Sequence, residues 1–64
     1  MRWKAGGYLI LLYSNDHPPL HVHIYKNGRL VAKYDIENGT FMKLVTVRQK
    51  SRILAALRRA KIIG

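Results

Sequence analysis

The chain has 64 residues, so we expect a single domain that spans residues 1–64. It contains no cysteine, which excludes disulfides and thiolate metal sites, and no apolar run approaches the roughly 18 residues that a membrane-spanning helix needs. Twelve lysines and arginines stand against three acidic residues, and the net charge of +9 indicates a polyanionic partner such as nucleic acid, anionic lipid or an acidic protein.

The first two thirds of the chain are predicted to form three to four strands. Tyr8–Tyr13 is an apolar run of strand length between glycines and polar residues, which is typical of a buried strand. The prolines that follow it have no N–H to donate, so Ser14–Pro19 is predicted as a loop. Two Asn-Gly pairs, each a strong hairpin signal, then divide the chain into further antiparallel strands. These strands are predicted at His21–Tyr25, Arg29–Ile36 and Thr40–Leu44.

The length of each Asn-Gly turn decides which side chains share a face of the sheet. A two-residue turn at Asn27-Gly28 would leave both faces mixed, whereas a three-residue turn that pairs Tyr25 with Arg29 separates apolar from polar side chains. We therefore expect three-residue turns. The predicted apolar face holds Val22, Ile24, Leu30, Ala32, Tyr34, Ile36, Met42 and Leu44. The predicted polar face holds His21, His23, Tyr25, Arg29, Val31, Lys33, Asp35, Phe41 and Lys43.

A single helix is predicted at the carboxy-terminal end. Thr46 and Gln49 match a capping box, which predicts a helix from Val47 to about Ile62. Its apolar stripe should pack on the apolar face of the sheet. The stripe consists of Ile53, Leu54, Leu57 and Ala60. The expected fold class is therefore α+β: a small antiparallel β-meander of three to four strands packed by one carboxy-terminal helix.

Three histidines, His17, His21 and His23, surround the two prolines, and the last two project from one face because they lie two apart on a strand. Three interpretations remain open. In the first, the rings are structural and hold the proline loop. In the second, they are the acid and base of a metal-independent ribonuclease, since the pKa of imidazole lies near neutrality, and Arg29 or Lys33 steadies the phosphate charge. In the third, all three bind zinc.

Cations and aromatic residues elsewhere suggest contacts to a nucleic-acid backbone and its bases. Arg48, Arg52 and Arg59 form a narrow row on the predicted helix, which is either a solvated surface or a set of phosphate contacts. On the predicted polar face, Lys43 is a further cation, and Tyr25 can stack on a base.

The run from Tyr13 to Ile24, with His17, Pro18, Pro19, His21 and His23, resembles a known bacterial family, as does the hairpin that follows it up to Gly39. It looks like the uncharacterised "domain of unknown function" family numbered forty-one sixty. That resemblance implies a gene pair of toxin–antitoxin type. The strand and closing helix are also weakly similar to Hic-type mRNA interferase toxins, although this sequence lacks their amino-terminal helix.

We expect a basic nucleic-acid-binding protein, most simply an RNA-binding one, of toxin–antitoxin type. In the ribonuclease interpretation His21 and His23 carry the acid–base chemistry, with His17 third, and no cofactor is needed. The main alternative is a non-catalytic module that docks an acidic partner protein or nucleic acid. A cognate acidic antitoxin-like protein and a homodimer are expected as partners, a membrane is not, and the expected location is cytoplasmic.

Overall fold

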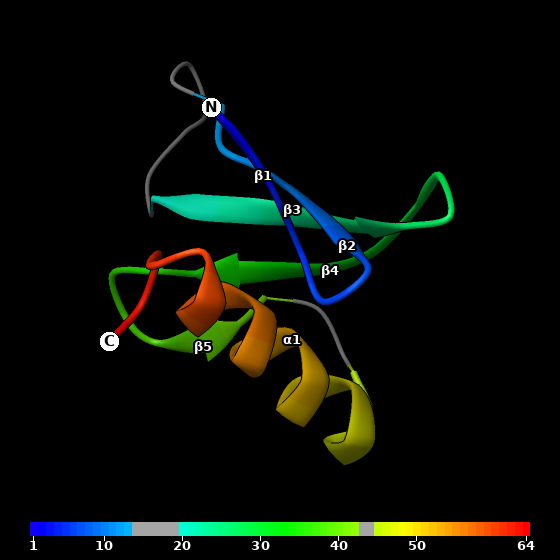
Figure 1. Cartoon of the computed structure of the whole chain (residues 1–64). Helices are drawn as coiled ribbons and strands as arrows, with labels where there is room; N and C mark the ends of the chain where they lie inside the picture. Colours follow the sequence, from blue (N-terminus) through cyan, green and yellow to red (C-terminus); the bar gives the residue numbers. More distant parts are fainter. Residues whose placement is uncertain (14–19, 43–44) are drawn as a thin grey trace.

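The computed structural model describes residues 1–13, 20–42 and 45–64, and it confirms the predicted fold class. Within these ranges, five strands form one antiparallel sheet in the order β1-β2-β3-β4-β5, and a single helix packs across one side of it (Figure 1). The elements are β1 (Arg2–Ala5), β2 (Tyr8–Leu11), β3 (His21–Lys26), β4 (Arg29–Asp35), β5 (Thr40–Phe41) and α1 (Val47–Arg59).

The first strand, β1, was missed by the sequence analysis. It pairs with β2 through a tight turn at Gly6 and Gly7, whose positive φ angles of 56° and 82° suit glycine. Two cations alternate with Trp3 and Ala5 along β1, and these two side chains face the core. This alternation, followed by Gly-Gly and an apolar run, is itself a hairpin signal.

The turn between β3 and β4 corrects the predicted length. Lys26 pairs with Arg29 across a two-residue turn, in which Asn27 and Gly28 have φ angles of 52° and 77°. Two successive residues with left-handed backbone conformations match the twist of paired strands, and Asn-Gly adopts these conformations readily. The register then shifts by one residue: Tyr25 pairs with Leu30, whereas Ile24 pairs with Ala32. Val31, between Leu30 and Ala32, is therefore the extra residue of a bulge in β4. From Ala32 onwards, the side chains of β4 lie on the faces predicted from the sequence.

The predicted turn between β4 and β5 was also wrong. Asp35 pairs with Thr40, so four residues rather than three connect the strands. The additional turn residue exchanges the two faces of β5, so that each of its side chains lies on the face opposite to the predicted one. Phe41 lies opposite Tyr34 on the core side, with the two rings 5.0 Å apart, whereas Met42 is exposed. The register predicted from the sequence instead puts Phe41 on the polar face and Met42 on the apolar face.

The helix begins at the predicted residue but ends earlier than expected. Both capping-box hydrogen bonds are present: Gln49 N donates to Thr46 Oγ1 at 3.2 Å, and Thr46 N donates to Gln49 Oε1 at 3.3 Å. At the other end, Lys61 takes a left-handed φ of 61° and its N–H donates to the carbonyl of Arg58. Such a cap usually contains glycine, so a lysine at this position does not predict it.

The core lies between α1 and one face of the sheet. Its buried members are Tyr8, Ile10, Val22, Ile24, Ala32, Tyr34, Ile53, Ala56 and Leu57. Ile53 and Leu57 from the predicted stripe are buried, but Leu54 and Ala60 are only partly buried. The β1–β2 turn approaches the helix closely, because a Cβ on Gly6 would lie 3.4 Å from the Cβ of Ala56. Because α1 covers the core face of the sheet, the other face points away from the helix.

Candidate nucleic-acid interface

Side chains that point away from α1 form what we call the second face of the sheet. Strand register fixes its central row, because Arg2 pairs with Leu11, Leu11 with His23, and His23 with Lys33. A histidine thus lies directly across from a lysine, with an arginine two strands away in the same row. The second face consists of Arg2, Lys4, Leu9, Leu11, His21, His23, Tyr25, Lys33 and Asp35.

The histidines of the second face lie in contact with each other. The ring centroids of His21 and His23 are 5.0 Å apart, with planes tilted by 54°. Tyr13 meets His23 edge-on, at 4.8 Å between ring centroids. His21 is the more deeply placed ring, only 9% exposed, whereas His23 is half-buried. A ligand on the second face would therefore reach His23 more readily than His21.

Asp35 lies across from His21 and is almost fully buried. Its carboxylate accepts hydrogen bonds from Asn38, at 3.0 Å from the backbone N and 2.6 Å from Nδ2. These bonds stabilise the ionised form, the Asn38 side chain contributing most, and they lower the pKa of Asp35 below its ordinary value of 3.8. His21 adds a weaker effect in the same direction. The second face thus keeps a carboxylate beside its histidines at neutral pH.

The lowered pKa of Asp35 predicts how stability depends on pH. A depressed carboxyl pKa stabilises the fold above the unfolded-state pKa near 3.8, and this contribution is lost as pH falls through the lower folded-state value. Asn38→Ala should therefore lower the urea midpoint at pH 6, and its difference from wild type should shrink as pH falls from 4 towards 2. A difference that stays constant with pH would show that Asn38 acts only through the turn backbone.

The other predicted binding residues are distributed over several surfaces. Lys33 lies directly across from His23, as the ribonuclease interpretation needs. Arg29 is exposed at the far end of β4, four residues away, which is about 13 Å along a strand. Tyr25 lies on the second face beside Leu9 and is half-buried. Of the two cations near the phosphate in the prediction, only Lys33 is brought to the histidines.

The arginine row does not join the second face. Arg48, Arg52 and Arg59 are all exposed on α1, and α1 covers the opposite side of the sheet (Figure 1). Two basic surfaces therefore exist, one on each side of the sheet. Of the remaining predicted site residues, His17 and Lys43 lie outside the described ranges.

Two cations of the second face were not predicted from the sequence. Arg2 and Lys4 are exposed and extend the basic row onto β1. They were missed because β1 itself was missed, although their alternation with Trp3 and Ala5 would have placed them on one face. With them, three cations lie on this face, and its carboxylate is held by Asn38.

Neither a metal centre nor a membrane-spanning helix is found in the described part of the chain. No group of three or more His, Cys, Asp or Glu side chains within residues 1–13, 20–42 and 45–64 could hold a metal ion. The three-histidine zinc alternative needs His17, which lies outside those ranges. No described helix is long and apolar enough to cross a membrane.

Comparisons with known proteins identify the family but give no activity. A search of curated proteins and a search of solved structures each found no match to the chain. A family profile matches residues 7–61, which run from the β1–β2 turn to the residue after the helix cap. The chain belongs to the family described as a domain of unknown function (DUF4160).

Proposed function

We propose that the protein binds single-stranded RNA on the second face of the sheet, as the basic partner of a toxin–antitoxin pair. The observation that carries this proposal is the cross-strand row that holds Arg2 on β1, His23 on β3 and Lys33 on β4, with Leu11 on β2 between the first two. Phosphate contacts from such cations supply affinity without base specificity.

The distribution of negative charge supports a polyanionic ligand. Of the acids in the described ranges, Asp35 is buried and held by Asn38, and Glu37 accepts a hydrogen bond from the backbone N of Leu20 at 3.1 Å. Little negative charge therefore opposes the field of a chain whose net charge is +9. A charge of this size exceeds what solubility requires of a small domain.

The shape of the second face favours single strands over a duplex. A sheet of five strands is too broad to enter the major groove of DNA as a helix or a two-stranded ribbon does. A sheet surface can instead receive unpaired bases on aromatic side chains while cations hold the backbone. Tyr25 lies next to the basic row on this face, and Lys4 and Leu9 share its cross-strand register. One base stacked on Tyr25 would place the adjacent phosphates near Lys4.

Removing charge from the second face should reduce both RNA affinity and its salt dependence. In Arg2→Gln/Lys33→Gln, two phosphate contacts are lost. The slope of log K against log salt should then fall by about 1.4 in magnitude, since each contact to a single strand contributes about 0.7. The measurement is fluorescence anisotropy of a labelled mixed-sequence RNA over a series of salt concentrations.

The matched control is Lys50→Gln/Arg58→Gln, which removes the same charge from α1. Both of these side chains are exposed and lie on the helix side of the sheet. The control should keep a slope close to that of wild type. If both double variants reduce the slope equally, the ligand senses only net charge and the second face is not the binding site.

A ribonuclease centre is the second candidate function, and the contact between His21 and His23 favours it. In this reaction the RNA 2′-hydroxyl attacks phosphorus, the bond to the 5′ oxygen breaks and a cyclic phosphate forms. One imidazole takes the hydroxyl proton and the other donates a proton to the leaving oxygen. Lys33, across from His23, is placed to stabilise the charge on the phosphate.

A further inference from the structure

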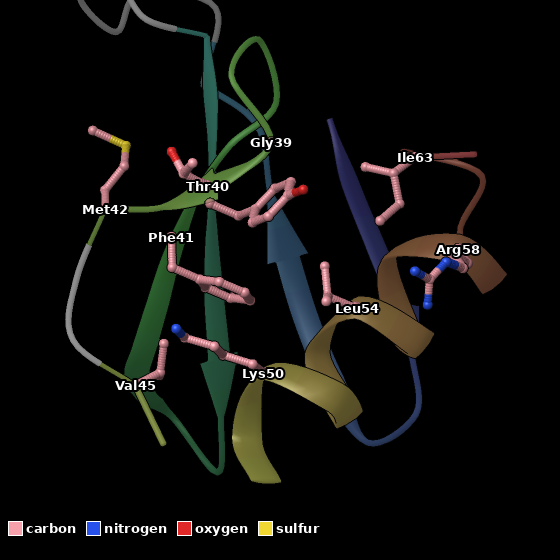
Figure 2. A pocket seen from close by; sticks show the side chains of 10 residues that line it. Gly39, Thr40, Phe41, Met42, Val45, Lys50, Leu54, Arg58 and Ile63 are labelled. Atoms are coloured by element: carbon pink, nitrogen blue, oxygen red, sulfur yellow. The ribbon is translucent and has the colours of Figure 1, made fainter. Parts of the chain in front are cut away.

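A groove of about 640 Å³ lies between α1 and β5, on the helix side of the sheet (Figure 2). Lys50, Leu54 and Arg58 project from successive turns of α1 and form one wall. Phe41 on β5 and the exposed Met42 form the other. The groove therefore presents an apolar middle between two cations.

The positive charge of the groove favours an anionic ligand. Lys50 and Arg58 are its cations, and no acidic residue is among the described residues that line it. A second copy of this chain is a poor occupant, because it also carries +9, and its two acids in the described ranges, Asp35 and Glu37, are already engaged in hydrogen bonds. The occupant must come from a molecule of opposite charge.

Both aromatic rings among the described residues of the groove already have neighbours, which disfavours stacking on a nucleobase. Tyr34 meets Phe41 edge-on with ring centroids 5.0 Å apart, and Lys50 Nζ lies 6.0 Å from the centre of the same ring. An aliphatic side chain, in contrast, can insert beside Leu54 and Met42, whose flexible thioether adapts to different shapes. These contacts favour an acidic peptide over RNA.

We propose that this groove binds an extended acidic segment of another protein, in which two carboxylates flank a leucine-like side chain. Lys50 and Arg58 are eight residues apart, which is about 12 Å along a helix. Two acids four residues apart in an extended chain span about 13 Å, and the residue midway between them points to the same side. The matching pattern is glutamate-x-leucine-x-glutamate. This inference is independent of the RNA proposal, which concerns the second face.

A labelled peptide of that pattern tests the groove directly. The probe is fluorescein-labelled Ser-Glu-Ser-Leu-Ser-Glu-Ser, and its anisotropy is measured with the full chain at low ionic strength. Lys50→Gln/Arg58→Gln should weaken binding about tenfold, the sum of two exposed ion pairs. Replacing the leucine of the peptide with serine should weaken binding to wild type by a similar factor, because its apolar contact is lost.

The matched control is Arg2→Gln/Lys33→Gln, which removes two charges from the second face and should keep peptide affinity. Circular dichroism establishes that each variant is folded. An equal loss in both double variants would overturn the proposal, since net charge alone would explain it. No saturable binding by wild type would also overturn it, as would equal affinity for the serine peptide. Loss of RNA binding in Lys50→Gln/Arg58→Gln would assign the groove to RNA instead.

Discussion

Replacing Leu57 with alanine is expected to leave the chain largely unfolded in water at 25 °C. Leu57 is fully buried between α1 and the sheet. A leucine-to-alanine change at such a site costs about 2–5 kcal/mol, through lost burial and the cavity that remains. A single core of this size supplies only about 3–5 kcal/mol of net stability. The change therefore removes most or all of it.

Urea unfolding followed by the fluorescence of Trp3 gives the measurement. Trp3 is the single tryptophan of the chain and packs against the core, so it reports on the packed state. The matched control is Leu54→Ala in the same helix, where the side chain is only partly buried and the cost should be about 1 kcal/mol. Equal midpoints for both variants would mean that α1 is held by contacts other than its buried stripe.

The faces of the sheet could be predicted from sequence because alternation is a local property. Val22, Ile24, Ala32 and Tyr34 lie on the core side as predicted. The turns could not be predicted as well. From Ala32 onwards, a bulge in β4 and a three-residue turn give the same sorting of faces, so the hydrophobic pattern there cannot tell them apart. Leu30 and Val31 are the exceptions, because Leu30 pairs with Tyr25 on the second face and Val31 packs against the core.

The error at β5 has a different cause. Asp35 accepts two hydrogen bonds from Asn38 and so organises a four-residue turn. Aspartate is favoured at the start of such turns, a signal that the alternation of faces does not contain. This turn places Phe41 on the core side, in contact with Tyr34, where it forms one wall of the groove. The proposed peptide groove thus depends on a turn that periodicity does not determine.

The candidate site was only partly predictable for the same reason. The spacing of His21 and His23 predicted a shared face, and the strand register adds Lys33 across from His23. Arg2 joins the row only through the pairing of β1 with β2. Contacts between distant segments depend on how the strands pair, and sequence spacing alone does not give this pairing.

The arrangement of charge places the two proposed binding surfaces on opposite sides of one small domain. The second face carries histidines and cations on paired strands, an arrangement that suits the proposed binding and cleavage of RNA. The groove on the helix side carries cations around an apolar centre, which suits a partner protein. A partner bound in the groove would leave the second face accessible, so it would modulate RNA binding through charge rather than by blocking the site.

If the second face is a ribonuclease centre, His23→Ala is expected to lower the rate of RNA cleavage roughly 100- to 10,000-fold, which is the usual contribution of a general acid or base. RNA affinity should stay close to that of wild type, because Lys33 and Arg2 still hold the phosphates. His23 is preferred over His21 for this test because it is the less buried ring. Cleavage is measured by gel on a labelled mixed-sequence RNA in the presence of a chelator.

The chelator and the variant together separate the three interpretations of the histidines. Cleavage that persists with chelator and disappears in His23→Ala would establish metal-independent acid–base chemistry. Cleavage that disappears with chelator in wild type would require a metal, and His17 would then become the residue to replace next. RNA bound but uncleaved by both proteins would make the histidines structural. In that case the contact between the rings and the bonds around Asp35 would serve to hold the basic row in register.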